Sequence, residues 1–301
     1  MATSPTVVGV GEILWDMLPT GRQLGGAPAN FAYCSHLLGS RSVVASRVGT
    51  DPLGKDIRTA LSKAGISDEF IQSDPSQPTG TAKVELDLAR QPRFEIIQPV
   101  AWDFLEWTEA WRTLAESSAA VCFGSLAQRS AESRRTIARF LDATSPDSLR
   151  VFDVNLRQHF YSPEVIHESL KRANVVKLSH EEEPRVRDLL GIHEIGDLAF
   201  CRILIDRFHL KLVCVTRGRK GSLLCDSSGI DEHPGFQVKV KDTVGAGDAF
   251  TAGLIHGLMQ GKCLRDLNQS ANRMGAWVAS QAGGMPEFPE TSIEEALRML
   301  E

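Results

Sequence analysis

The sequence predicts an α/β protein with a doubly wound, mostly parallel sheet, helices on both faces of that sheet, and a small additional β sheet. Three observations support this fold class. From residue 119 onward, short apolar runs alternate with helical patterns, which is typical of parallel strands joined by crossover helices. Between residues 81 and 98, polar and apolar residues alternate, which is typical of half-exposed antiparallel strands. The chain has 301 residues and 42% hydrophobic content, enough for a sizeable core.

The first apolar segment, residues 6 to 13, predicts a buried strand. Gly9 and Gly11 hint at the glycine fingerprint of dinucleotide-binding proteins. Leu14 stands where the third glycine of that fingerprint belongs, and no glycine-led helix follows. A nicotinamide-dependent dehydrogenase therefore gains little support, although it stays open as a second class of enzyme.

The next segments predict the first helix and a lid. An Ala-rich helix covers residues 27 to 38, and a buried strand at 43 to 48 precedes a helix that ends near residue 64. A further short strand follows Gly65. The alternating segments 81 to 88 and 93 to 98 predict an antiparallel hairpin. With the segment that precedes the first helix, this hairpin would form a lid built from about 12–24 and 79–100.

The second half of the chain continues the parallel sheet. We expect strands at 119–123, 150–154, 175–178 and 212–215, with helices at about 130–143, 163–172 and 195–209. Ligands of such sheets bind beyond the carboxyl ends of the strands. No linker-like composition and no repeat interrupts the chain, so we expect a single domain spanning residues 1–301.

One stretch, Asp242 to Phe250, carries the most chemistry. It follows a strand-like run at 236–240 and opens a helical run, so the triplet Gly245-Ala246-Gly247 lies where a loop becomes a helix. The first turn of a helix has unpaired N–H groups and a positive dipole end, which together favour a bound anion. Asp248 would lie in that turn, either as a helix cap or as a base. The dipole predicts that Asp248 stays ionised at neutral pH.

Composition excludes some partners. The formal net charge of -5 gives no electrostatic reason to bind nucleic acid or an anionic membrane. No run of 18 apolar residues could span a bilayer, and a strand pattern that begins at residue 6 leaves no room for a signal peptide. The six cysteines are scattered without a paired motif, so we expect reduced cysteines and a cytoplasmic protein.

Two motifs resemble those of a known family. Asp242-Thr-Val-Gly-Ala-Gly-Asp-Ala-Phe250 resembles the C-terminal signature of the ribokinase-like, pfkB-type carbohydrate kinases, and Gly25-Gly-Ala-Pro-Ala-Asn30 resembles their N-terminal signature. The sequence is most similar to the fructokinase branch. The resemblance implies transfer of the γ-phosphate of ATP to a sugar hydroxyl, in the first place the 6-hydroxyl of fructose. It also implies a lid that closes over the substrate and can pair two subunits.

The resemblance assigns roles to the residues at the acceptor side. It makes Asp248 the base, with the amides of residues 245 to 247 and Arg157 holding the transferred phosphate. It places the sugar against Asp16, Gly25, Gly26, Asn30 and Asn155. Taken alone, Asp16 could be a solvated turn residue, Asn30 a local cap, and Arg157 half of a surface ion pair.

The resemblance also assigns the nucleotide and the cations. No Walker loop is present, and ATP would instead lie along Thr216, Gly218, Gly221, Asn272 and Ser179, with Asn272 near the start of a helix at 271–282. Ser179 stands where the family has Asn, which puts its direct role in doubt. Glu182 would assist Mg²⁺ through water. A monovalent cation, K⁺ by expectation, would bind near Asp242, Val244 and the 281–284 loop with Gly283.

Other functions stay open at this point. The acceptor could be ribose, 2-keto-3-deoxygluconate or a nucleoside instead of fructose. A sugar-responsive binding protein that uses the kinase fold without turnover is a second class, although the intact Asp248 speaks against it.

Overall fold

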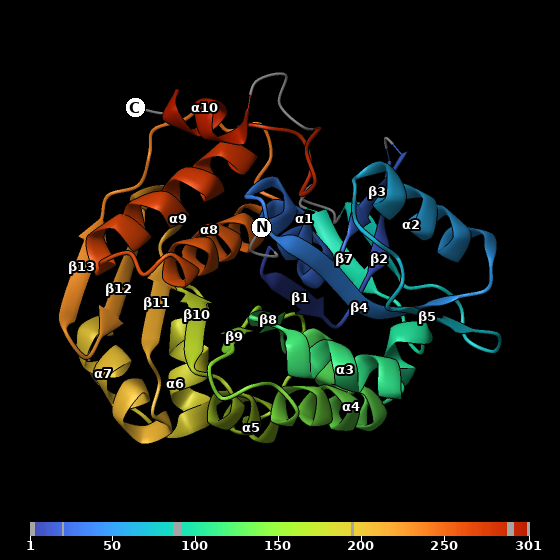
Figure 1. Ribbon diagram of the computed structural model, residues 1–301, viewed down its shortest axis with the longest axis horizontal. Coiled ribbons are helices and arrows are strands. Elements are labelled where there is room, and N and C mark those ends of the chain that lie inside the picture. Colours follow the sequence, from blue (N-terminus) through green and yellow to red (C-terminus); the bar gives the residue numbers. More distant parts are fainter. Residues whose placement is uncertain (1–3, 20, 87–91, 194–195, 288–291, 300–301) are drawn as a thin grey trace.

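The computed structural model describes residues 4–19, 21–86, 92–193, 196–287 and 292–299. Within these residues, nine strands form one sheet in the order β13-β12-β11-β10-β9-β8-β1-β4-β5, and four strands form a second sheet in the order β3-β2-β6-β7 (Figure 1). The predicted fold class is therefore confirmed.

The large sheet is parallel from β5 to β11 and ends in an antiparallel pair, β12 and β13. From β1, the chain first adds strands on one side and then, from β8, on the other. The strand order thus reverses between β1 and β8, and ligands of open α/β sheets bind at such a point. The strands of this sheet are β1 Thr6–Val10, β4 Arg41–Gly49, β5 Ile71–Asp74, β8 Ala120–Phe123, β9 Leu149–Asp153, β10 Val175–Ser179, β11 Leu212–Thr216, β12 Ser222–Asp226 and β13 Gly229–His233.

Helices cover both faces of this sheet. One face carries α3 to α7, and the other carries α1, α8, α9 and α10 (Figure 1). Strand β8 explains why the central strands read as continuous apolar runs: Val121 and Phe123 pack on the first face, whereas Ala120 and Cys122 pack on the second. The helices are α1 Ala27–Leu37, α2 Pro52–Lys63, α3 Glu109–Ser117, α4 Ala131–Asp142, α5 Pro163–Arg172, α6 Glu183–Leu190, α7 Asp197–Phe208, α8 Ala246–Met259, α9 Leu264–Ala279 and α10 Ile293–Arg298.

Two predicted elements differ from the structure. Residues 236–240 form no strand, because the run makes no ladder with a neighbour and leaves Val240 56% exposed. The helix expected at 271–282 is α9, which begins at Leu264 and ends at Ala279. Asn272 consequently lies in the middle of a helix. The hairpin of β12 and β13 was not foreseen.

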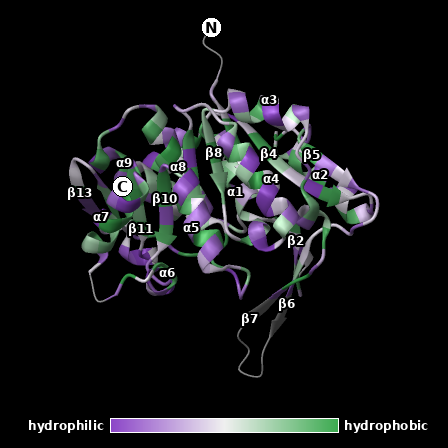
Figure 2. Ribbon diagram, turned by 90° about the horizontal axis from the view of Figure 1, so that it is seen from below, coloured by the Kyte–Doolittle hydropathy of each residue, from purple (hydrophilic) through white to green (hydrophobic). Residues whose placement is uncertain are grey.

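The small sheet is built from the segments expected to form the lid. It comprises β2 Leu14–Leu18, β3 Gly21–Gly25, β6 Thr81–Leu86 and β7 Pro92–Ile96. β6 and β7 pair antiparallel, as predicted, and β2 pairs with β6 in parallel. Both β6 and β7 extend away from the large sheet (Figure 2). Residues 87 and 88, which the prediction included, lie outside the described residues.

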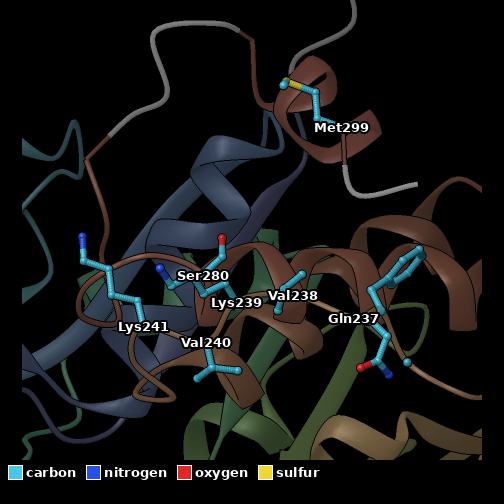
Figure 3. Close-up of a pocket in the computed structure, with 9 residues that line it drawn as sticks. Gln237, Val238, Lys239, Val240, Lys241, Ser280 and Met299 are labelled. Carbon is cyan, nitrogen blue, oxygen red and sulfur yellow. The ribbon is translucent and has the colours of Figure 1, made fainter.

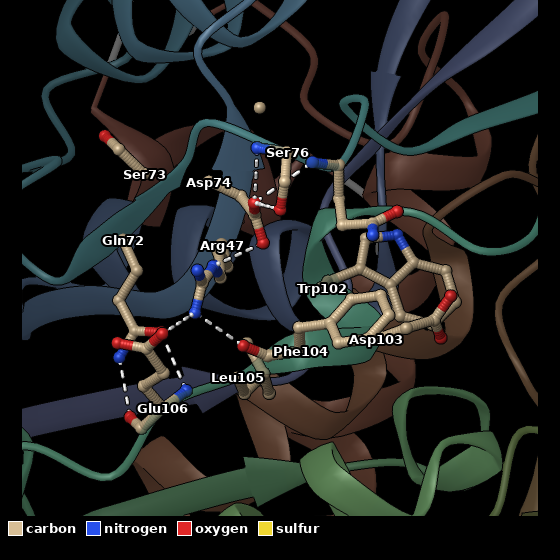
Figure 4. A network of polar contacts seen from close by, with 12 residues as sticks. Arg47, Gln72, Ser73, Asp74, Ser76, Trp102, Asp103, Phe104, Leu105 and Glu106 are labelled. Atoms are coloured by element: carbon tan, nitrogen blue, oxygen red, sulfur yellow. Dashed lines mark hydrogen bonds and ion pairs between the residues drawn. The ribbon is translucent and has the colours of Figure 1, made fainter.

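A buried arginine fixes the root of this extension. In β4, Arg47 places Nε 2.9 Å from Asp74 Oδ2 and Nη1 2.6 Å from Glu106 Oε1. The same Nη1 donates to the Phe104 carbonyl oxygen at 2.7 Å (Figure 4). Arg47 thereby ties β4, β5 and the turn after β7 together, as charge-assisted hydrogen bonds of this kind are strong.

Two expectations from the sequence concern membrane-spanning helices and the state of the cysteines. None of the helices in the described residues is both long and apolar enough to cross a membrane. All six cysteines are unpaired, and five are buried, but Cys263 is exposed.

Candidate active site

The carboxyl ends of the central strands bring together charged side chains from distant parts of the chain. Glu12 follows β1, Asp16 lies in β2, Arg157 follows β9 and Asp248 lies in the first turn of α8. Burial raises the pKa of all three acids, and the positive charge of Arg157 opposes that shift in each. The four groups therefore share one region, at the edge where the strand order reverses.

The start of α8 has the form expected of an anion site. Gly245 precedes the helix in the left-handed conformation, with a φ of 75°. No side chain caps the helix, so the positive end of its dipole faces the region that holds Asp248. A side chain at Gly245 would collide with the backbone of Gly284, so only glycine allows this close approach.

Among the described residues, the Asp248 carboxylate accepts one side-chain hydrogen bond, which the sequence did not suggest. Asn30 Nδ2, from α1, donates to Asp248 Oδ2 at 2.8 Å. Burial raises the pKa of Asp248, and Asn30, Lys177 and Arg157 only partly offset that effect. Removal from water thus acts against the effect expected of the helix dipole, and ionisation of Asp248 at neutral pH stays a prediction. A raised pKa makes the carboxylate a stronger base.

Asn30 is itself buried, with 4% of its surface exposed, and its Oδ1 has no hydrogen-bond partner among the described residues. The expected role as a sugar ligand remains compatible with this free acceptor atom. The Nδ2 group, however, is used to orient Asp248 rather than to cap α1.

Glu12 is one residue that sequence reasoning missed. It is 2% exposed, its Oε2 has no hydrogen-bond partner in the described part of the chain, and burial raises its pKa to about 7. The sequence did contain a signal for Glu12, because it is a charged residue two positions after the buried strand β1. The search for a dinucleotide fingerprint used only the glycines beside it.

Asp16 lies against Gly25 of the N-terminal motif. It pairs with Gln23 across β2 and β3, and a side chain at Gly25 would collide with its carboxylate. Burial raises the pKa of Asp16 to about 6. Gly26 precedes α1 with a φ of 107°, and a Cβ there would lie 2.6 Å from the Glu12 carbonyl oxygen. The two glycines thus allow the Asp16 carboxylate and the Glu12 backbone to approach the start of α1 closely.

The loop after β9 carries Asn155 and Arg157. Asn155 has a φ of 43°, and its carbonyl oxygen accepts a hydrogen bond from Ser125 Oγ at 3.3 Å. Arg157 is exposed and donates to the Leu156 carbonyl oxygen at 3.3 Å. Among the described residues it has no ion-pair partner within 4.0 Å, so the alternative of a surface ion pair is not seen there.

Glu182 joins the ends of β9 and β10. Its Oε1 accepts from the Leu156 N–H at 2.6 Å and its Oε2 from the Ser179 N–H at 2.8 Å. Ser179 Oγ accepts in return from the Glu182 N–H at 3.3 Å. The serine therefore keeps the turn closed. Both Glu182 oxygens are engaged, so any contact with Mg²⁺ would use their remaining lone pairs, and no three metal-binding side chains converge in the described ranges.

The residues expected to bind the nucleotide lie close together near the turn between β11 and β12. Thr216, Gly218 and Gly221 lie at this turn, where Gly221 closely approaches the His233 backbone. Asn272 reaches the same turn from α9, because its Nδ2 donates to Ser222 Oγ at 2.7 Å, and Ser222 pairs with Thr216. The same Nδ2 also donates to Asn268 within a buried network. Its amide nitrogen is therefore used inside the core.

A cavity of about 810 Å³ lies beside the C-terminal ends of α9 and α10. Residues 235–241 line it, together with Ser280 and Met299 (Figure 3). Two of these residues, Lys239 and Lys241, are exposed cations, and Lys241 immediately precedes Asp242. The segment that lines the cavity therefore continues into the loop before α8.

The residues expected at a cation site are brought together. Asp242 Oδ1 accepts from the Val244 N–H, and Oδ2 accepts from the Gly283 N–H, both at 3.0 Å. The carboxylate thus connects the loop before α8 to the loop after α9.

A site of this kind, with an uncapped helix start and acids at the carboxyl edge of a doubly wound sheet, is typical of an enzyme that transfers a phosphoryl group.

Comparison with known proteins agrees with this class of enzyme. A model of the pfkB family of carbohydrate kinases matches residues 19–291. A fructokinase of Escherichia coli is 32% identical over 93% of this chain and 95% of its own length. A putative sugar kinase of Pyrococcus horikoshii is 30% identical, covering 92% of this chain and 91% of its own.

Solved structures agree as well. The fructokinase of Vibrio cholerae, determined with fructose, ADP and calcium ion bound, superimposes with a TM-score of 0.81 at 28% identity, covering all of both chains. The Pyrococcus horikoshii sugar kinase in complex with ATP gives 0.80 at 29% identity, covering 98% of this chain and 99% of that one. The chain belongs to the pfkB family of carbohydrate kinases. This confirms the resemblance and removes the dehydrogenase alternative.

Proposed function

We propose that this sugar kinase is an ATP-dependent fructokinase that phosphorylates the 6-hydroxyl of fructose. The observation that carries the proposal is the Asp248 carboxylate, held at 2.8 Å by Asn30 at the uncapped start of α8. Fructokinases among the relatives, and a neighbour determined with fructose and ADP, support the choice of sugar.

The chemistry follows from the positions of these groups. The acceptor oxygen attacks the γ-phosphorus, the bond from that phosphorus to the bridging oxygen of ADP breaks, and Asp248 takes the hydroxyl proton. The amides of residues 245 to 247 and the Arg157 guanidinium face the negative charge on the transferred group. Transfer then depends mainly on positioning and charge stabilisation.

The acceptor would lie between the small sheet and the edge of the large sheet. Ionised Asp16 accepts hydrogen bonds from two hydroxyls, with the amides of Gly25 and Gly26 beside the sugar. Asn30 Oδ1, which has no hydrogen-bond partner among the described residues, accepts another. Asn155 lies beside Arg157 on the other side. The small sheet would act as a lid that keeps water from competing as acceptor, and its exposed face is where we place a possible dimer contact.

ATP would extend from α8 into the cavity lined by residues 235–241, with Thr216, Gly218 and Gly221 along its other side. The donor set fits Mg²⁺ that takes most ligands from phosphate and water, with Glu182 and Ser179 acting through water. Bound Mg²⁺ would neutralise phosphate charge. K⁺ would bind beside Asp242, Val244 and Gly283. A cytoplasmic location, as expected from the cysteines, completes the proposal.

The test is acceptor-dependent ADP formation with a panel of fructose, ribose, 2-keto-3-deoxygluconate and nucleosides. We expect fructose to give the highest kcat/KM. In the Asp16→Ala variant, the loss of hydrogen bonds to hydroxyls should raise the KM for fructose by about tenfold or more. Asp147→Ala is the matched control, because Asp147 is exposed and precedes β9 at the opposite edge of the sheet.

Turnover of another member of the panel but not of fructose would reject the fructokinase assignment. ATP and sugar binding without turnover would favour the non-catalytic alternative.

A further inference from the structure

A buried ion pair lies directly beneath the first turn of α8. Lys177 Nζ, from β10, is 3.0 Å from Asp153 Oδ1 and 3.1 Å from Oδ2, at the end of β9. Lys177 is 7% exposed and Asp153 3% exposed. Breaking such a pair leaves a buried charge without compensation, which is costly. The sequence motifs gave neither residue a role.

This pair contacts α8 at two points. Thr251 Oγ1 donates to Asp153 Oδ2 at 3.1 Å and lies 3.0 Å from the Gly247 carbonyl oxygen. A Cβ on Gly247 would lie 3.0 Å from Lys177 Nζ. The ammonium therefore lies so close to Gly247 that a side chain at this residue would have to displace it slightly.

The charges around Asp248 come from every neighbouring element. Burial would lower the pKa of Lys177, but Asp153, Glu182 and Asp248 together hold it above its usual range, so Lys177 stays charged. Its charge in turn favours the ionised form of Asp248. The other titratable groups that face Asp248 are Glu12 after β1, Arg157 and Asp153 of β9 and its loop, and the thiols Cys34 of α1 and Cys122 of β8.

We propose that Lys177, held by Asp153, is a positioning residue for phosphoryl transfer: it fixes the first turn of α8 and presents a constant positive charge to Asp248 and the anion site from below. The inference rests on the proposed role of Asp248 as the base. Lys177 touches neither substrate, since Gly247 and the helix backbone lie above it. It acts by keeping the amides in place and the base ionised.

The two members of the pair have opposite charges, so removal of one or the other should shift the pKa of Asp248 in opposite directions. Lys177→Met removes the cation, and the pKa of Asp248 should rise by about one unit. Asp153→Asn removes an anion and leaves Lys177 unneutralised, so that pKa should fall. Asn keeps the shape of Asp153 and an acceptor for Thr251, so this variant keeps the test valid if Lys177→Met does not fold.

The first readout is the acidic limb of kcat/KM against pH, which reports the base of the free enzyme. We expect the acidic limb to move to higher pH in Lys177→Met and to lower pH in Asp153→Asn. The kcat of Lys177→Met should fall by about tenfold or more, while the KM for ATP stays close to that of the parent. The control is Lys171→Met, which removes an exposed lysine of α5 that pairs with Glu168 at 3.0 Å and should leave the profile unchanged.

The second readout needs no substrate. The Asp248 carboxyl can be titrated by NMR in ¹³C-aspartate-labelled protein and assigned with Asp248→Asn. If fructose proves not to be the acceptor, this titration still decides the role of Lys177, so the two proposals fail separately. Folded variants whose Asp248 titration and kcat both match the parent would overturn the inference and leave the pair as a purely structural contact.

Discussion

At the scale of single residues, Asp248 and Asn30 form the centre of the candidate site. Replacing Asp248 by Asn keeps the shape and the contact with α1 but removes the proton acceptor. We expect kcat to fall by about 10²- to 10⁴-fold, the usual effect of losing a general base, with less than about tenfold change in ATP affinity. Steady-state kinetics and nucleotide titration measure the two effects.

The helix-cap alternative makes a different prediction for the same variant. Because Asn caps helices about as well as Asp, a mere cap would leave turnover within a few-fold of the parent. That result would require another base, and Glu12 would be the first residue to test.

Glu12 offers a test of stability against pH. Its pKa is about 7 in the folded protein and 4.5 in its ordinary state, so the folded chain binds more protons between these values. The free energy of unfolding should therefore fall as pH rises from about 4.5 to about 7. In Glu12→Gln this loss should be smaller by about 3 kcal/mol. Urea unfolding at pH 5 and pH 8 measures the difference, and equal pH dependence in both proteins would contradict the burial argument.

At the scale of elements, Asp242 connects the loops at both ends of the α8–α9 pair. A monovalent cation beside Asp242 would stabilise the loop that forms the anion site. It would also make the electrostatic potential at that site more positive. We expect activity to be several times higher in K⁺ than in Na⁺ at fixed Mg²⁺ and ionic strength. Asp242→Asn should abolish the difference, whereas Asp147→Asn should preserve it. Equal rates of the parent in both salts would contradict the site.

The elements also indicate what the sequence could predict. Strands buried on both faces, such as β8, are recognisable because every residue is apolar. The run at 236–240 alternates in the same way as an edge strand, but pairing depends on a neighbour that the local pattern does not reveal. The start of α9 was misplaced because polar residues such as Arg265 and Asn268 interrupt its apolar stripe. The sequence therefore did not reveal that Asn272 also takes part in a buried network, and its role at the nucleotide stays a prediction.

The sequence suggests candidate residues where a motif is contiguous but not where the site is assembled by the fold. The Gly-Ala-Gly triplet and Asp242 lie in one stretch, so the sequence alone suggests them, and their roles stay predictions. Glu12, Lys177 and the partnership of Asn30 with Asp248 depend on three-dimensional contacts between β1, β10, α1 and α8. In the sequence, such contacts are indicated by isolated charged residues within or beside apolar runs.

At the scale of the whole molecule, the sheet order places the site between the earliest and the latest parts of the chain. β1 lies inside the large sheet, with β4 and β5 on one side and β8 and the later strands on the other. The helices α1 and α8 share one apolar cluster, to which Phe31, Cys34 and Phe250 belong. The base is therefore positioned only after both ends of the chain have joined the same face of the sheet.

This arrangement has a consequence for synthesis on the ribosome. Asn30 and Asp248 are 218 residues apart, which corresponds to roughly 10 to 40 s of translation at ordinary rates. During that interval, the side of α1 that later packs on α8 has no partner, and the nascent chain presents an apolar helix to its surroundings. The contact that orients the base therefore forms late in synthesis, although the hydrogen bond from Tyr33 to the Pro286 carbonyl oxygen spans still more residues.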